Sequence, residues 1–133
     1  MKVTMTNGEM VGAVNRITAM QNRESENKEK LFGDRIKIIY AIKKNKDRLT
    51  RLLKPYEESR DELLQECNKK EAQLNGCVDI RNDCKEKWKK GMDELLGIES
   101  EVDIHTVRFS EIEGLSLSIS DLEAIEFMLE CAE

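Results

Sequence analysis

Residues 38–67 read IIYAIKKNKDRLTRLLKPYEESRDELLQEC, and this stretch decides the fold. Its apolar residues return every seven positions, at Ile42, Leu49, Tyr56 and Leu63, with charged side chains on the other faces. A heptad-like stripe of this kind indicates a long amphipathic helix that packs on another helix, as in a coiled coil. We therefore expect a long charged helix that begins near residues 31–33.

Three residues interrupt the pattern of this helix. Asn45 and Ser59 place polar side chains at the second position of the apolar seam, so the zipper is imperfect. Pro55 lacks a backbone N–H and strains the turn before it, which predicts either a kink or a new helix with Pro55 in its first turn. The apolar phase continues unchanged through Pro55, which favours the kink.

A second helical stripe follows a turn signal. Asn75 and Gly76 form the best turn dipeptide in the chain. Apolar residues then recur at helical spacing until Gly97, which would cap the helix; they are Cys84, Trp88, Met92 and Leu95. This helix is expected to run back along the long one as a hairpin.

The two ends of the chain add smaller elements. Residues 1–6 alternate as a short strand, and Thr6 and Glu9 have the spacing of a capping box for a short helix that ends in a polar loop at residues 21–30. Residues 99–112 are rich in β-branched side chains and predict a strand that could pair with residues 1–6 in a ribbon lying on the helices.

The last element is a helix with Ser118 as its cap. Leu122, Ile125 and Leu129 are expected on its inner face, with Met128 beside them. Taken together, the patterns predict one mainly α domain of the α+β class spanning residues 1–133. It combines a long kinked helix in a hairpin, a short N-terminal helix, a C-terminal helix and a small two-stranded ribbon.

Composition indicates the type of fold and the cellular location of the protein. Charged residues make up 37% of the chain and aromatic residues 5%, which favours long solvated helices. There is neither an apolar run of membrane-spanning length nor an apolar signal core near Met1, so we expect a cytoplasmic protein without a membrane partner. The four cysteines form no Cys-x-x-Cys pair, and in a reducing cytosol they predict free thiols: Cys67, Cys77, Cys84 and Cys131.

Charge is divided unevenly along the chain. Residues 92–133 hold twelve acids and one base, whereas residues 28–54 hold ten bases and three acids. The basic stretch could follow nucleic-acid phosphates, but a solvated helix face that pairs with the acidic third is favoured over that reading. We take seven residues as the candidate interaction surface: Lys43, Lys44, Arg48, Arg51, Glu123, Glu126 and Glu130.

The sequence shows none of the usual catalytic arrangements. His105 is the single histidine and falls in the predicted strand, where a structural role is the commoner one. Gly-rich phosphate loops are absent, and carboxylate pairs such as Glu111/Glu113 are expected by chance in so acidic a segment. We expect no enzyme activity, no cofactor and no metal site.

Three stretches together resemble a family of small uncharacterised proteins encoded by tailed bacteriophages and prophages of Gram-positive bacteria. They are residues 5–9 (MTNGE), residues 53–60 (LKPYEESR), and the end from residues 93–96 (DELL) through the strand to residues 114–118 (GLSLS). The segment from Cys67 to Lys90 matches least. The resemblance implies a phage or prophage setting and brings no assigned activity or site residues.

The sequence thus predicts a non-enzymatic phage or prophage protein that binds another protein. It is expected to form a homo-oligomer, most simply a two-fold dimer. One rival is an inhibitor of a host defence or nuclease system that uses the acidic C-terminal third as a nucleic-acid mimic. The other rival is a nucleic-acid binder that uses residues 28–54.

Overall fold

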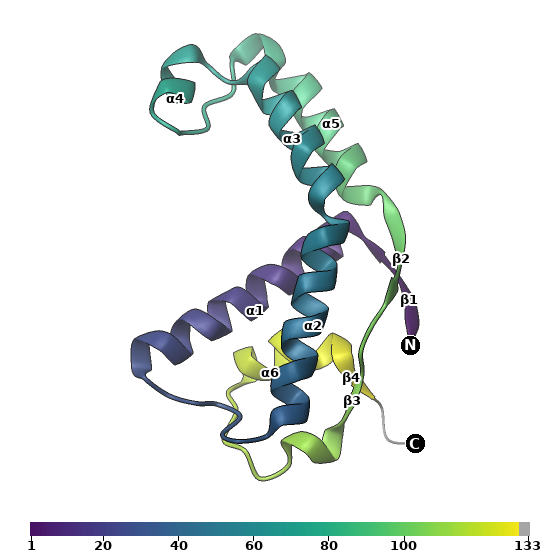
Figure 1. Cartoon of the computed structure of the whole chain (residues 1–133). Helices are drawn as coiled ribbons and strands as arrows, with labels where there is room; N and C mark the ends of the chain where they lie inside the picture. The colour runs from purple at the N-terminus through teal and green to yellow at the C-terminus, as the bar shows by residue number, and fades with distance from the viewer. Residues whose placement is uncertain (131–133) are drawn as a thin grey trace.

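The computed structural model describes residues 1–130 and confirms a mainly α fold with a small antiparallel ribbon. In chain order the elements are β1 (Lys2–Thr6), α1 (Asn7–Asn27), α2 (Ile36–Leu52), α3 (Lys54–Cys67), α4 (Lys70–Leu74), η1 (Asn82–Cys84), α5 (Lys85–Gly97), β2 (Glu99–Asp103), β3 (Val107–Arg108), η2 (Phe109–Ile112), α6 (Ile119–Ile125), η3 (Glu126–Met128) and β4 (Leu129–Glu130). Figure 1 shows a body built from α1, α2, α6 and the strands, and an arm of α3 and α5 that projects from it with α4 at its far end.

The predicted ribbon is present but shorter than expected. β1 and β2 pair antiparallel with Val3 opposite Val102 and Met5 opposite Ser100. β2 ends at Asp103, so His105 lies in the link to β3 and not in a strand. β3 pairs in parallel with β4 over two residues, a contact that the sequence did not indicate.

The first helix is longer than predicted. The capping box at Thr6 and Glu9 is present, with Glu9 N donating to Thr6 Oγ1 at 3.0 Å and Thr6 N donating to Glu9 Oε1 at 3.1 Å. The expected loop at residues 21–30 was wrong in its first part, because α1 continues to Asn27. Arg23 on this extra length reaches Asp121, and Lys28 ends the helix in the left-handed conformation.

Pro55 marks a junction between two helices that follow one another almost end to end. It stands in the first turn of α3, and Leu53 is the one residue between α2 and α3. The Leu53 backbone stays helical, accepting from Glu57 N at 2.9 Å and donating to Leu49 O at 3.0 Å. The sequence predicted either a kink or a new helix at Pro55, and both occur. A new helix, α3, starts at Lys54, and the helix axis bends there without reversing, as Figure 1 shows.

The heptad-like stripe is covered within the chain. Ile42, Leu49 and Tyr56 are buried and Leu63 is half-buried. α2 packs on α1 and on the segments that follow β2, whereas α3 packs on α5 as the predicted hairpin. The stripe is thus used for intramolecular packing along its whole length.

The core lies between α1, α2, the ribbon and the C-terminal elements. Its largest fully buried apolar side chains are Met10, Ile17, Met20, Ile38, Leu49, Val102, Ile104, Ile125 and Met128. The predicted C-terminal helix begins at its Ser118 capping box and is short, ending at Ile125. Ile125 is buried and Leu122 half-buried on α6, as predicted. The prediction was wrong for Leu129, which is half-buried in β4 and not on the helix, and the buried Met128 lies in η3.

Asp121 on α6 forms an ion pair with Arg23 on α1, and this pair makes the stability of the fold depend on pH in acid. Burial raises the pKa of its carboxyl, but the Arg23 guanidinium at 2.9 Å and hydrogen bonding from Ser118, whose backbone N donates to the carboxyl at 3.1 Å, more than offset this, so the pKa lies below its usual value. Such a depressed pKa stabilises the fold above the unfolded-state pKa of about 3.9, and the stabilisation is lost as pH falls through the folded-state pKa.

We expect Asp121→Asn to lower the free energy of unfolding at pH 7 by about 1.5 kcal/mol, because it weakens a partly buried charged hydrogen bond. As the pH falls below the unfolded-state pKa of about 3.9, the difference from the unsubstituted protein should shrink, because the unfolded state takes up the proton first and the lowered pKa of Asp121 no longer favours folding to the same extent. Thermal unfolding from pH 2 to 7 measures both, with the exposed Glu123→Gln as control. An equal difference at both ends of the pH range would contradict this assignment.

Candidate interaction surfaces

The predicted basic residues lie along α2 and are partly occupied by contacts within the chain. Lys43 and Arg51 are exposed, and Lys44 and Arg48 are half-buried. Arg51 pairs with Asp47 at 3.0 Å and Arg48 Nη1 lies 3.9 Å from an Asp103 carboxylate oxygen. Lys44 Nζ stands 5.7 Å from the centre of the Tyr40 ring, where a cation is attracted by the aromatic face.

Within residues 1–130, the expected pairing between the basic stretch and the acidic third occurs at two places. Besides Arg48 with Asp103, Lys37 lies 3.7 Å from Glu111, whose backbone oxygen also accepts from Arg35 at 3.0 Å. The remaining predicted acids are exposed: Glu123 on α6, Glu126 at the start of η3 and Glu130 on β4. Glu130 accepts from Thr106 Oγ1 at 2.7 Å.

The structure adds an apolar surface on α2 that the seven predicted residues did not include. Ile36, Ile39 and Tyr40 are 77%, 39% and 53% exposed. They stand three and four residues apart, so they share one helix face, and Lys43 continues that face. We call Ile36, Ile39 and Tyr40 the ridge. Apolar side chains gathered on an exposed helix face are characteristic of binding surfaces.

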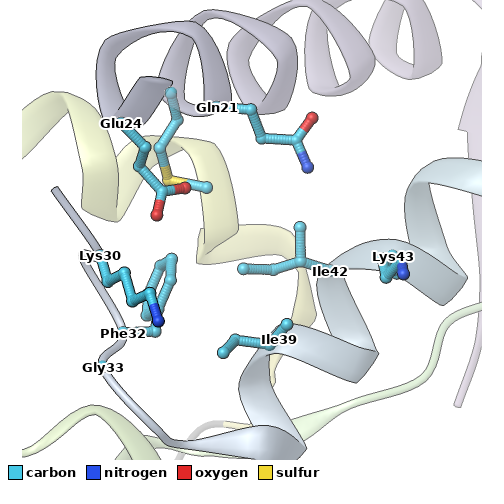
Figure 2. Close-up of a pocket in the computed structure, with 9 residues that line it drawn as sticks. Gln21, Glu24, Lys30, Phe32, Gly33, Ile39, Ile42 and Lys43 are labelled. Atoms are coloured by element: carbon cyan, nitrogen blue, oxygen red, sulfur yellow. The ribbon is translucent and has the colours of Figure 1, made fainter. Parts of the chain in front are cut away.

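A hollow of about 390 Å³ borders the ridge on one side (Figure 2). Its apolar floor comes from Met20, Phe32 and Ile42, all buried, with Ile39 at its edge. Lys30 and Glu24 stand at the rim, and Glu24 also accepts from Leu31 N at 3.2 Å. We call this the first hollow. Its lining suits an apolar side chain better than a polar ligand.

A second hollow of about 650 Å³ lies on the other side of the ridge. It is lined by Ile36, Lys37, Tyr40, His105, Thr106, Val107, Arg108, Glu111 and Glu130. The Tyr40 and His105 rings meet edge to face with 5.6 Å between their centres. His105 is held through its backbone, since its N–H and C=O bond to the buried Asn45 amide at 2.8 Å each. The histidine therefore serves packing and backbone anchoring here.

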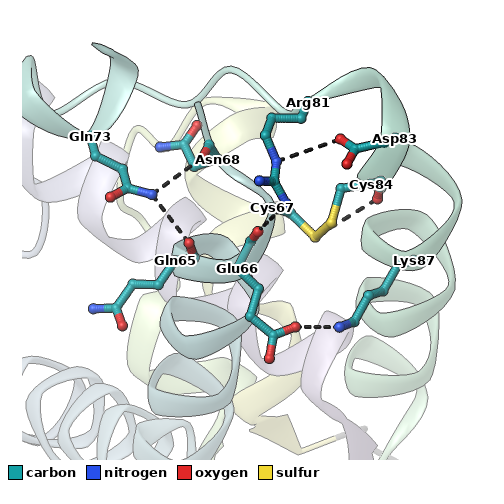
Figure 3. The surroundings of a disulfide bond; sticks show 9 residues. All are labelled: Gln65, Glu66, Cys67, Asn68, Gln73, Arg81, Asp83, Cys84 and Lys87. Atoms are coloured by element: carbon teal, nitrogen blue, oxygen red, sulfur yellow. Dashed lines mark hydrogen bonds and ion pairs between the residues drawn. A yellow bond between two sulfur atoms is a disulfide. The ribbon is translucent and has the colours of Figure 1, made fainter. Parts of the chain in front are cut away.

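The far end of the arm is the segment 68–81, which includes α4 and which we call the knob (Figure 3). The buried Asn68 side chain holds both sides of the knob, donating to Cys77 O at 2.8 Å and accepting from Asp79 N at 2.6 Å. Gln73 Nε2 adds bonds of 3.2 Å to the backbone oxygens of Gln65 and Asn68. Its turn passes through Gly76, whose φ of +68° favours glycine.

The knob presents apolar side chains to solvent. Leu74 is 88% exposed and Val78 is 62% exposed, on either side of the Asn75–Gly76 turn. Leu74 ends α4, which lies at the far end of the arm in Figure 1. An ordered loop whose most exposed residues are apolar fits a contact site better than an idle connection.

A disulfide between Cys67 and Cys84 fastens the base of the knob (Figure 3). The prediction of four free thiols was therefore wrong for this pair. The two residues are 17 apart in sequence, and only the return of α5 along α3 brings their Cα atoms to 5.3 Å. Cys77 is a free, exposed thiol, and Cys131 lies outside the described residues.

Two further observations bear on chemistry. Among residues 1–130 there is no group of three histidine, cysteine or acidic side chains placed to hold a metal ion. Over the same residues, no helix has the length and apolarity that crossing a membrane requires. The first hollow has a mainly apolar lining, whereas the second is lined by apolar and charged side chains, of which Lys37 and Glu111 form an ion pair.

Comparisons of the chain with protein-family models, with curated proteins and with solved structures found no match. The candidate interaction surfaces are therefore identified from side-chain exposure, hollows and charge. The ridge had a signal in the sequence, because Ile36, Ile39 and Tyr40 form a second apolar face outside the heptad phase. For the knob, the only signal in the sequence was the Asn75–Gly76 turn, because no local pattern shows that Leu74 and Val78 are exposed.

Proposed function

We propose that this protein is a non-enzymatic interaction protein that binds a second copy of itself through the ridge on α2. The supporting observation is the exposure of Ile36, Ile39 and Tyr40 on one face of a well-packed helix. Covering them would remove apolar surface from water, at roughly 25 cal/mol per Å². The two hollows beside the ridge offer recesses for side chains of a partner.

The charges around the ridge support a second copy as the partner. The exposed Arg108 lines the second hollow together with the exposed Glu130 and the half-buried Glu111, and the exposed Lys43 lines the first hollow together with Glu24. A surface that carries both signs can match itself after a two-fold rotation. Charge supports the nucleic-acid binder and the nucleic-acid mimic less well. Lys37 and Arg48 of the basic stretch and Asp121 of the acidic third are already paired within the chain.

The proposal keeps the setting that the sequence resemblance implies, a phage or prophage protein acting in the host cytoplasm. Within that setting, self-association would prepare a two-fold surface for a further host or phage protein.

Replacing Ile36 and Tyr40 together by glutamate tests the ridge. The Ile36→Glu/Tyr40→Glu variant should weaken self-association at least about tenfold, because it places charge in an apolar contact. Light scattering on chromatography fractions over about a hundredfold range of protein concentration measures this. The matched control is Ile119→Glu, which changes an isoleucine that is 76% exposed in the first turn of α6. Equal masses for the double variant and the unsubstituted protein at every concentration would remove the ridge from the interface.

A further inference from the structure

We infer that the two copies lie antiparallel, with α2 of each along α3 of the other, so that the knob of one copy reaches the ridge of its partner. This inference rests on the proposed self-association and specifies its geometry. It links two exposed apolar surfaces that lie at opposite ends of the molecule in Figure 1.

The first support is the position of the two surfaces along the α2–α3 rod. Tyr40 comes 13 residues before Leu53, and Cys67, at the base of the knob, comes 14 residues after it. At about 1.5 Å per helical residue, each surface lies about 20 Å from the junction. A two-fold axis at Leu53, perpendicular to the rod, therefore brings each knob level with the ridge of the other copy.

The second support is the division of charge at the same junction. α2 carries six bases and one acid, whereas α3 carries five acids and two bases. Antiparallel copies place the basic helix of one beside the acidic helix of the other. Parallel copies would place like charges together, which costs several kcal/mol at an interface.

Individual charges fit this arrangement. Lys44 and Glu62 each stand nine residues from Leu53, on opposite sides. A two-fold axis at Leu53 sets the members of this pair at the same level on facing helices. Glu58 and Glu62 are exposed and, within residues 1–130, form no ion pair, so they are available to a partner.

The third support is the rigidity of the knob. The Asn68 hydrogen bonds hold Cys77 and Asp79, which flank Val78, before any contact, so binding would incur little loss of loop entropy. These bonds do not involve the disulfide, which a reducing cytosol would open. The first hollow, with its apolar floor of Met20, Phe32 and Ile42, lies directly beside the ridge and can accept such side chains. Lys69 pairs with Asp79 at 3.2 Å, so these two charges are neutralised within the knob.

Cross-linking between two different variants tests the arrangement. In a Cys77→Ser/Cys131→Ser background, one chain carries Ile36→Cys and the other carries Leu74→Cys, at positions 77% and 88% exposed. A short bismaleimide added to the mixture should produce mainly a covalent heterodimer, whereas the Ile36→Cys chain alone should give none. Cross-linking of Ile36→Cys alone, with no heterodimer in the mixture, would overturn the antiparallel arrangement and leave self-association standing. A monomeric, uncross-linked mixture would overturn both.

Charge reversal gives an independent test that separates antiparallel from parallel copies. Lys43→Glu/Lys44→Glu and Glu58→Lys/Glu62→Lys should each raise the dimer Kd about 30-fold. All four changes in one chain restore opposite charges only between antiparallel copies, and the Kd should return to within about threefold of the starting value. A fourfold variant as weak as either double variant would overturn the inference.

Discussion

Asn45→Ala is expected to lower the free energy of unfolding by about 3 kcal/mol, one of the two largest effects of any substitution considered for this protein. Asn45 is fully buried on α2, and its amide accepts from His105 N and donates to His105 O, at 2.8 Å each. Alanine would leave both backbone groups without their partner and open a cavity beside Met128. The link between β2 and β3 would lose its anchor to the core.

Urea unfolding of the variant and of the unsubstituted protein measures this effect. The matched control is Asn22→Ala, an exposed asparagine within α1, which should change the free energy of unfolding by less than about 0.5 kcal/mol. If Asn45→Ala differs from the control by less than about 1 kcal/mol, the two hydrogen bonds to His105 do not contribute as described.

Removing the Cys67–Cys84 disulfide should lower stability by a similar amount, about 3 kcal/mol, because a loop of this size is constrained in the unfolded chain. The loss should be concentrated in the arm, since the knob depends on the closure of α3 onto α5. We expect faster amide hydrogen exchange at Asn68 and Asp79 in the Cys67→Ser/Cys84→Ser variant, and little change in α1.

Chemical unfolding without and with a reducing agent provides the corresponding measurement on the unsubstituted protein. Cys77→Ser serves as the control, because this thiol is exposed and outside the disulfide. The account of the knob is contradicted if reduction leaves both stability and exchange at Asn68 unchanged. Because thiols stay reduced in a cytosol, the same comparison shows how firmly the knob is held in each redox setting.

Periodicity predicted the elements of this fold well where a helix or strand buries one clear face. The Ile42, Leu49, Tyr56 stripe and the capping residues Thr6 and Ser118 each carry their signal within a few residues. The kink at Pro55 follows from the missing N–H in the same local way. These features needed no knowledge of distant contacts.

Features that depend on distant contacts could not be read locally. In the sequence Asn45 is a polar residue at an apolar position of the heptad-like stripe. Its side-chain amide is hydrogen-bonded to the backbone of His105, 60 residues away in sequence. α1 continues past Gln21 because its polar side chains have partners far away in the sequence: Gln21 accepts a hydrogen bond from Lys46, and Arg23 donates one to Asp121. Cys67 and Cys84 showed no paired-cysteine motif, since only the hairpin brings them together.

The candidate site was predicted in part for the same reason. The sequence indicated the basic side of α2 and the acidic C-terminal third, but their partial neutralisation by Arg48–Asp103 and Lys37–Glu111 depends on the fold. The ridge emerged once the core had taken Ile38 and Ile42 and left Ile36, Ile39 and Tyr40 outside. Exposure is a property of the whole packing, and a helix with apolar residues on two faces does not reveal which face is covered.

Self-association is the central claim, and sedimentation equilibrium of the unsubstituted protein tests it most directly. The chain has a mass of 15.4 kDa, and the apparent mass should rise with concentration towards twice that value. A rise that stops at the dimer supports a closed two-fold interface. A mass of one chain at every concentration would contradict the account.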